Sequence, residues 1–398
     1  MSKIFITADW HLAEGAWKSR PEIAGDAFES LRRLVEQVDT GDKILAAGDL
    51  FDMKRPSADT VVNVASIFYG KSLSTFFIQG QHEFSKIPWL SLFNYGISNA
   101  HHVDHFAAQE CFAKTCDVPP SYGWQLGEDA DEVVVYAMDW SLSLNLQSKL
   151  DDIGKILDKD RVANPNIYRI LMLHQTCNAV MAGTGIDREK ILEQLDYRAC
   201  ELKDWMIPHG FDLIVVGDTH YHTEFQLIDK KGHLNRCLSP GIFTMQTVSE
   251  TNTGQCFVLD TKTKEISSLE LYRRPYKEVS IDTPVDFDKE IRGYIKAPTL
   301  PEFDIPIVQY TLYEKDADRI ALLQQASSGK AHLFFRVIAV EQEEDVSDTS
   351  RVECLDDLVA HAIKESQSTD KAKNLLTDLI NGNSPDEVLH AYYKETVL

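Results

Sequence analysis

Three short apolar segments near the N-terminus each lead directly into residues that can bind metal ions. Residues 4–7, 43–47 and 74–78 have the length and the composition of buried strands. They are followed by Asp9-Trp10-His11, Gly48-Asp49-Leu50-Phe51-Asp52 and Gly80-Gln81-His82-Glu83. Because ligands of open α/β sheets gather beyond the carboxyl ends of the strands, this order predicts an α/β fold with a site at one sheet edge.

Two further predicted strands end in histidine and acidic residues. Residues 168–173 precede His174, and residues 213–216 precede Gly217-Asp218-Thr219-His220. A mixture of carboxylate, imidazole and amide donors suits Mn²⁺, Fe or Zn²⁺ better than the all-oxygen shells preferred by Mg²⁺ and Ca²⁺. A bridging carboxylate can hold two such ions, so that a bridging hydroxide forms at neutral pH and both ions contact the phosphoryl oxygens. The pattern therefore predicts phosphoester hydrolysis.

The composition indicates a globular protein with a sizeable core. The chain has 398 residues, 43% hydrophobic and 26% charged, which argues against a disordered or collagen-like chain. No apolar run approaches the roughly 18 residues of a membrane span, and no signal-peptide pattern is visible. The seven cysteines are scattered without Cys-x-x-Cys spacing, which favours reduced thiols. We therefore expect a cytoplasmic protein with no membrane partner.

The formal net charge of -22 limits the choice of partners. Nucleic-acid-binding proteins usually present basic surface, because neutralised phosphates release counterions and supply much of the affinity. Either the substrate is small or grasped locally through metal ions, or a partner supplies the basic surface. Exposed acidic residues can also serve solubility alone.

The chain divides into three predicted regions. Residues 1–272 alternate strand-like and helix-like segments and predict one α/β domain. Helical spacing is found in 22–38 and 58–68, and Pro, Gly and Asn-Pro signals predict irregular segments at 101–130 and 141–166. Residues 273–340 predict a small strand-helix-strand domain. Residues 341–398 predict an acidic linker followed by a helical tail.

The five motifs, taken in order, resemble the calcineurin-like metallophosphoesterase superfamily. Within it, three features resemble the SbcD family, the meiotic recombination eleven nucleases and their phage relatives. These features are Gly48-Asp49-Leu50-Phe51-Asp52 followed by Pro56-Ser57, His174-Gln175, and Ser239-Pro240-Gly241. The resemblance implies a sandwich of two mostly mixed β-sheets flanked by helices over residues 1–272. It also implies a small α+β capping domain over 273–340, beginning near Arg274-Pro275-Tyr276, and a helical partner-binding tail.

The resemblance also implies roles for individual residues. Asp9, His11 and His220 would bind the first metal ion and Asp49 would bridge, while Gln81, His174 and Asp218 would bind the second. His82 would not be a ligand but would protonate the leaving oxygen. The family usually has Asn where this chain has Gln81, and His where it has Asp218. Both replacements are oxygen donors, so we expect a more oxygen-rich second site.

Other polar residues near the motifs have competing interpretations. Asp52 is expected to orient a ligand rather than to bind metal. His222 is interpreted either as a metal ligand, if the last motif is shifted by two residues, or as a residue that supports a ligand or contacts phosphate. Lys54 and Arg55, like Arg273-Arg274, are candidate phosphate contacts or ordinary exposed charges. His101, His102 and His105 are assigned no role.

These observations lead to a main prediction and two alternatives. The main prediction is a metal-dependent DNA exonuclease or endonuclease that acts on DNA ends in recombination or repair. The resemblance implies dependence on two divalent ions, most often Mn²⁺, with Fe, Zn²⁺ or Mg²⁺ as alternatives. It also implies a coiled-coil ATPase partner of the SbcC type and the cytosol of a bacterial or phage-infected cell, and a homodimer is left open. The alternatives are a phosphatase or phosphodiesterase acting on nucleotides or phosphoproteins, and a catalytically weak scaffold subunit.

Overall fold

A computed structural model describes most of the chain in several stretches. The described residues are 2–13, 25–69, 71, 73–85, 88–94, 99–102, 123–126, 133–141, 143–177, 202–245, 253–312 and 317–338. The chain separates into two compact units, Met1–Ile338 and Ala339–Leu398. The second unit, and with it the predicted linker and tail, lies outside the described residues. The domain boundaries at 272/273 and 340/341 stay predictions.

The first sheet carries the three N-terminal motifs. Its strand order is β12-β11-β1-β2-β3-β4. The strands are β1 (Lys3–Thr7), β2 (Lys43–Ala47), β3 (Ser74–Ile78), β4 (Asn99–His102), β11 (Gln255–Asp260) and β12 (Ile266–Glu270). Strands β1 to β4 are parallel, whereas β11 and β12 are antiparallel additions beside β1. The parallel part brings the ends of β1, β2 and β3 to one edge.

The second sheet carries the remaining two motifs. Its order is β5-β6-β7-β8-β10-β9. The strands are β5 (Gly123–Leu126), β6 (Val133–Met138), β7 (Tyr168–His174), β8 (Leu213–Gly217), β9 (Thr223–Ile228) and β10 (Leu234–Ser239). Strands β6, β7, β8 and β10 are parallel, and β5 and β9 pair antiparallel at the two edges. His174 and Gly217 end neighbouring parallel strands, so their loops leave the sheet together.

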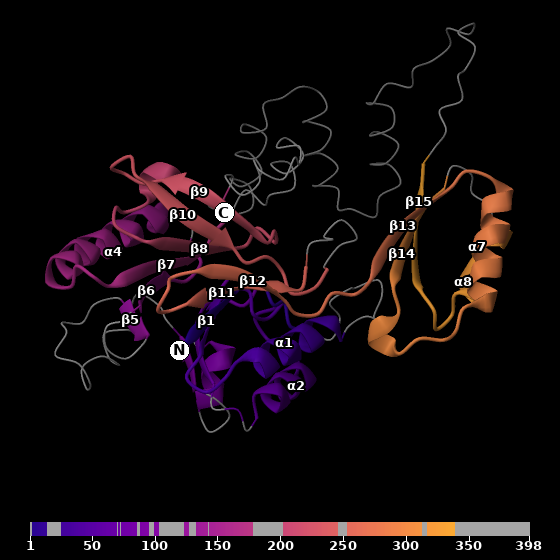
Figure 1. Ribbon diagram of the computed structural model, residues 1–398, viewed down its shortest axis with the longest axis horizontal. Helices are drawn as coiled ribbons and strands as arrows, with labels where there is room; N and C mark the ends of the chain where they lie inside the picture. Colours follow the sequence, from indigo (N-terminus) through magenta and orange to yellow (C-terminus); the bar gives the residue numbers. More distant parts are fainter. Residues whose placement is uncertain are drawn as a thin grey trace, which may run out of the picture. The chain divides into compact units, whose positions relative to one another are not determined.

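The two sheets pack face to face and are covered by helices (Figure 1). Buried side chains from both sheets form the central layer, among them Ile6, Leu45, Ile78, Val135, Met172 and Val215. A second cluster packs α1 (Asp26–Gln37) and α2 (Ala58–Phe68) on the first sheet. A third packs α4 (Ser143–Ala163) on the second. Two short 3-10 helices, η2 (Trp89–Asn94) and η5 (Asp204–Met206), complete this part. The predicted α/β sandwich of two mixed sheets flanked by helices is confirmed.

Helix α4 corrects the prediction of an irregular segment at 141–166. Leu146, Leu150, Ile153 and Leu157 are buried at helical spacing and face the second sheet. The Asn164-Pro165 signal marks the end of this helix, because the structure has Ala163 as its last residue. Most of the other predicted irregular segment, 101–130, lies outside the described residues.

Residues 273–338 form a small parallel sheet with two helices on one face. The order is β13-β14-β15. The elements are β13 (Tyr276–Ile281), α7 (Pro284–Lys296), η6 (Glu302–Asp304), β14 (Ile307–Leu312), α8 (Ala317–Ala326) and β15 (His332–Val337). Both strand pairs are parallel, so the unit is a repeated strand-helix-strand arrangement rather than the expected α+β arrangement. Among the described residues, no helix is long and apolar enough to cross a membrane.

Candidate metal centre

The loops after β1, β2 and β8 hold unusual backbone conformations. Of the six non-glycine residues with positive φ in the described chain, five are predicted ligands: Asp9, His11, Asp49, Asp218 and His220. Such conformations cost free energy and persist where the surrounding structure enforces them, commonly at functional sites. Backbone hydrogen bonds join the first two loops, from Asp9 N to Gly48 O and from His11 N to Asp49 O, both 3.0 Å long. These bonds therefore fix Asp9, His11 and Asp49 relative to one another.

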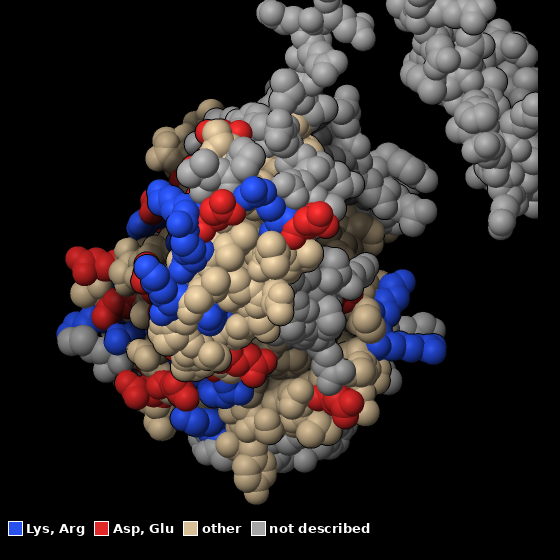
Figure 2. Space-filling model, turned by 90° about the vertical axis from the view of Figure 1, so that its right-hand side faces the viewer, with Lys and Arg blue, Asp and Glu red and all other residues tan. Residues whose placement is uncertain are grey.

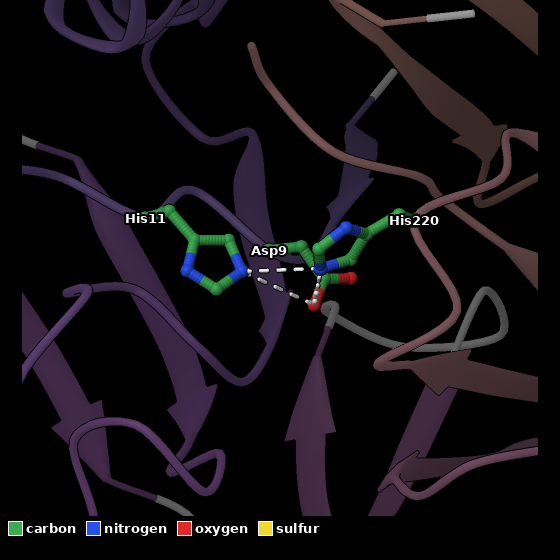
Figure 3. Close-up of side chains that lie close together, drawn as sticks. All are labelled: Asp9, His11 and His220. Atoms are coloured by element: carbon green, nitrogen blue, oxygen red, sulfur yellow. Dashed lines mark hydrogen bonds and ion pairs between the residues drawn. The ribbon is translucent and has the colours of Figure 1, made fainter. Parts of the chain in front are cut away.

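Asp9, His11 and His220 form the first cluster of potential ligands. Both histidine rings point toward the Asp9 carboxylate (Figure 3). The distances from Asp9 Oδ1 are 4.0 Å to His11 Nε2 and 3.9 Å to His220 Nε2. The two Nε2 atoms lie 3.2 Å apart. Two imidazole nitrogens and a carboxylate oxygen around one point are the donors that Zn²⁺ and Mn²⁺ accept, so this cluster fits a divalent ion.

Asp9, Asp49 and His174 form a second cluster, which is fully buried. His174 Nδ1 donates a 2.6 Å hydrogen bond to Ala47 O, which leaves its Nε2 facing Asp49 Oδ2 at 3.1 Å. Apart from this contact with each other, neither His174 Nε2 nor Asp49 Oδ2 has a hydrogen-bond partner. Buried polar atoms without partners are rare and costly. A cation between them would satisfy both, and because Asp49 also lies beside His11, it can bridge the two clusters.

The charges in the buried cluster favour a positive ion. Burial raises the pKa of Asp9. Burial would also lower the pKa of His174, but the carboxylates of Asp49, Asp9 and Asp218 outweigh it and raise that pKa. Burial likewise opposes ionisation of Asp49, yet His174 and two more histidines hold its pKa below the usual range. The pocket thus needs positive charge, which divalent ions would supply.

Gln81 and Asp218, the two departures from the family pattern, contact each other. Gln81 Nε2 donates a 2.6 Å hydrogen bond to Asp218 Oδ1, and Thr176 Oγ1 donates a 2.5 Å one to Asp218 Oδ2. The amide of Gln81 is thereby oriented, and its buried Oε1 has no hydrogen-bond partner. Asp218 Oδ1 lies 3.9 Å from His174 Nε2. The pair fits the predicted oxygen-rich second site, with Gln81 Oε1 as the free donor.

His82 lies on the open side of the centre. Its side chain is 41% exposed, and its Nε2 lies 3.9 Å from Asp49 Oδ2. Its Nδ1 lies 3.4 Å from Asp52 Oδ1, and the interaction with Asp52 outweighs burial and raises the pKa of His82 to about 9. Asp52 also lies 3.2 Å from His11 Nδ1. Asp52 therefore orients two histidines from behind, and His82 can hold a proton where substrate would bind.

The comparison with protein-family models assigns this chain to a family. The model of the calcineurin-like phosphoesterases matches residues 2–222. The chain belongs to the calcineurin-like phosphoesterase family. Its clustered His and Asp residues agree with the two-metal centre of these phosphoesterases, and metal-dependent phosphoester hydrolysis is the activity that the family implies.

Solved structures and curated proteins add little to this family assignment. A protein of unknown function, AQ665, from Aquifex aeolicus is 14% identical over 51% of this chain and 89% of that one, with a TM-score of 0.25. The purple acid phosphatase PPD1 from yellow lupin (Lupinus luteus) seeds is 13% identical over 68% of this chain and 54% of that one, with a TM-score of 0.29. No curated protein matches the chain.

Several predicted contacts lie away from the phosphoesterase centre. His222 Nδ1 lies 2.8 Å from Pro240 O, its Nε2 lies 2.9 Å from Ser268 Oγ, and its ring stacks on Phe257. The structure thus places His222 in packing between strands rather than among the ligands. Lys54 and Arg55 are exposed after the second motif, where a phosphate contact stays a prediction.

Glu83 has a structural role that the sequence motif did not reveal. Its buried carboxylate accepts hydrogen bonds from Leu50 N at 3.1 Å and from Phe51 N at 3.0 Å, which fastens the third motif to the second. Burial and the nearby charge of Asp49 raise the pKa of Glu83 to about 8. A divalent ion on Asp49 would oppose this shift. The position of Glu83 directly after His82 was the available signal.

His102 and Asp139 contact each other and support the segment that leads into the third motif. Asp139 Oδ1 accepts a 2.7 Å hydrogen bond from Gln79 N and lies 2.8 Å from His102 Nε2. Trp140 N donates to Gln79 O at 2.9 Å. Gln79, two residues before Gln81, is therefore held by Asp139 and Trp140 after β6, and His102 of β4 in turn contacts Asp139. The sequence assigned no role to His102, because its partner Asp139 lies 37 residues away.

Proposed function

We propose that the protein is a metal-dependent nuclease that hydrolyses phosphodiester bonds at DNA ends in recombination or repair. The proposal of metal-dependent hydrolysis rests on one observation. Asp9, Asp49, His174 and His220 lie close together, and the buried atoms Asp49 Oδ2 and His174 Nε2 have no hydrogen-bond partner outside this pair. The choice of DNA rests on the resemblance to the SbcD family over the second motif with Pro56-Ser57, over His174-Gln175 and over Ser239-Pro240-Gly241. Metal-dependent phosphoester hydrolysis is common to the family, whereas DNA is the proposed substrate.

The side chains of the centre would have two roles in hydrolysis, metal binding and proton donation. Asp9, His11 and His220 would hold one ion and Gln81, His174 and Asp218 the other, with Asp49 between them. Bound ions would lower the pKa of water and offset charge on the phosphoryl oxygens. Asp52 keeps His82 protonated, and His82 donates that proton to the leaving oxygen. Glu83 and Asp139 keep the loop with His82 in register with Asp49.

The exposure of the centre suits a long substrate. Asp9, Asp49 and His174 are buried, while the His220 and His82 side chains are 27% and 41% exposed and mark the open side. A backbone phosphate of a polymer could reach these rings without entering a deep cavity. The chain carries a net charge of -22, and on the face of the molecule that carries α7 and α8, Lys and Arg side chains stand among Asp and Glu side chains (Figure 2). Bound ions or a partner would therefore supply most of the positive charge for phosphate contacts.

The purified chain with Mn²⁺ is expected to cleave end-labelled single- or double-stranded DNA, and a chelator should abolish the reaction. A small diester and a phosphomonoester in parallel reactions test the alternative of a phosphatase or phosphodiesterase, which the net charge favours. Efficient hydrolysis of a small ester with no cleavage of DNA would contradict the nuclease proposal. The lengths and ends of the DNA products report the polarity of digestion.

Deleting residues 355–398 is expected to abolish co-purification with a coiled-coil ATPase of the SbcC type. The proposed partner-binding segments, 355–366 and 371–379, have apolar residues at helical spacing that can dock on a partner helix. Metal content measured on the same sample should be unchanged, because no centre residue lies in the deleted segment. An intact complex after the deletion would contradict this role. Complex formation without DNA cleavage by the full chain would favour the scaffold alternative.

A further inference from the structure

His209, Asp229 and His233 form a further cluster of potential metal ligands, remote from the phosphoesterase centre. Asp229 and His233 flank the turn between β9 and β10, and His209 precedes β8. Strand β9 begins beside His222 and runs away from the centre for six residues. At about 3.4 Å per residue, Asp229 lies about 20 Å from the start of that strand. The cluster is therefore a separate site.

The turn holds the Asp229 carboxylate in place. Asp229 N donates to His233 O and Gly232 N donates to Asp229 O, each at 2.9 Å, so Asp229 and His233 face each other across the turn. Gly232 has a φ of 83°, which glycine adopts without a steric cost. Asp229 Oδ1 accepts from Lys231 N at 2.8 Å and from His233 N at 3.0 Å. The carboxylate is buried and needs no rearrangement to act as a ligand.

Two imidazoles flank this carboxylate from one side. His209 Nδ1 lies 2.7 Å from Asp229 Oδ2, and His233 Nδ1 lies 3.6 Å from Asp229 Oδ1. Ligands at 2.0–2.2 Å from a tetrahedral zinc ion lie about 3.4 Å from each other, which is close to the 3.6 Å separation of His233 and longer than the 2.7 Å separation of His209. The His209 ring would move outward from Asp229 to share an ion with the other two donors.

Hydrogen bonds hold the side chains of Asp229 and His209 in place, but the contact between His233 and Asp229 is not a hydrogen bond. The 3.6 Å separation from Asp229 is too long for a hydrogen bond. The His233 ring instead lies against that of His209, with centroids 4.2 Å apart and planes 33° from parallel. Both rings direct Nδ1 toward the Asp229 carboxylate, and imidazole nitrogen is a common ligand of divalent ions. The arrangement of His233 thus matches that of a ligand.

We propose that His209, Asp229 and His233 bind an additional divalent ion of the Zn²⁺ class, which fastens the β9–β10 turn to the segment before β8. Two imidazoles and one carboxylate are a donor set for Zn²⁺, with water completing the shell. A pocket of about 360 Å³, lined by His209, Lys155, Lys230 and Asp158 among others, adjoins the cluster and gives solvent a path to His209. Lys230 pairs with Asp151, so its charge is offset within the pocket. The proposal is independent of the substrate of the phosphoesterase centre.

Zinc counting tests the proposal on the full chain. The protein is stripped with a chelator, saturated with Zn²⁺, desalted, and its zinc measured by mass spectrometry. Wild type is expected to retain one more ion per chain than His233→Ala or His209→Ala. His233 is the safer variant, because its side chain is 62% exposed and contributes little to the core. Equal zinc content in wild type and both variants would overturn the proposal.

A matched control keeps the turn but spares the ligands. Lys231→Ala changes an exposed side chain of the same turn and preserves the backbone N–H that Asp229 accepts, so it should retain the wild-type zinc content. Mn²⁺-dependent ester hydrolysis by His233→Ala should equal that of wild type, because His233 lies outside the phosphoesterase centre. In crystals soaked with zinc, an anomalous peak should lie between the three side chains. Its absence there, with peaks at the phosphoesterase centre, would also overturn the proposal.

Discussion

His82→Ala is expected to lower the rate of phosphodiester hydrolysis by about 10²–10⁴-fold while leaving the metal content unchanged. The imidazole lies at the open side of the centre, and Asp52 raises its pKa to about 9, so the ring carries a proton at neutral pH. That proton is available to the leaving oxygen. His82 also lies within reach of His11 and Asp49, but its side chain is 41% exposed and both buried clusters are complete without it, so its loss should spare the metal ions. The measurement is kcat on DNA together with Mn²⁺ bound per chain.

Two further variants serve as controls for His82→Ala. Asp49→Ala should lose both the metal ions and the activity, because Asp49 lies between the two clusters. His222→Ala removes a histidine that contacts Pro240 and Ser268 outside the centre, so it should retain both. A substrate whose leaving group needs no proton, such as a nitrophenyl ester, should be affected less by His82→Ala. Wild-type cleavage of DNA by His82→Ala would refute the proton-donor assignment.

Strands were predicted well where they are short, apolar and buried on both faces. The segments 43–47 and 74–78 correspond to β2 and β3, because a parallel sheet covered on both faces leaves continuous apolar runs. Edge strands leave a weaker signal. Strand β9 alternates exposed and half-buried residues and contains Glu224 and Gln226, so its pairing with β10 depends on tertiary context.

Helices next to proline were harder to predict. Proline is tolerated at Pro284, the first residue of α7, because the first turn of a helix has no intrahelical partner for the N–H that proline lacks. The Asp286 carboxylate accepts a 3.1 Å hydrogen bond from Thr283 N, which helps to start the helix. The segment Thr283-Pro284-Val285-Asp286 therefore has the residues of a helix start, although the several prolines nearby argued against a helix.

The sequence predicted the candidate ligands of the centre but not the residues that hold these ligands in place. Ligand candidates follow strands directly, so the sequence order alone places them at one edge. Glu83, Asp139 and His102 act on the centre through contacts that join segments 32 to 60 residues apart. Such pairings have no local pattern, since each residue alone is an ordinary polar side chain. The strained backbone of Asp9 and Asp49 is likewise visible only in three dimensions.

Arg274→Ala is expected to destabilise the fold by about 3–5 kcal/mol, the cost of leaving one partner of a buried ion pair alone. Arg274 was a candidate phosphate contact, but the structure buries it against Asp26 at the start of α1. Its Nε and Nη2 donate to the two Asp26 carboxylate oxygens at 2.6 and 2.5 Å. Its Nη1 donates to Glu302 O and Ile305 O, both at 2.8 Å. Arg274 thus ties α1 to the segment before β14.

Denaturant unfolding of Arg274→Ala, Arg273→Ala and Asp26→Ala/Arg274→Ala measures this effect. Arg273 is the neighbouring exposed arginine, so its loss should change the free energy of unfolding by less than about 0.5 kcal/mol. The double variant removes both charges, so it should be less destabilised than the sum of the two single variants. If Arg274→Ala were as stable as Arg273→Ala and instead weakened DNA binding, the arginine would be a phosphate contact after all. The structure favours the first outcome, because both side chains of the ion pair are at most 3% exposed.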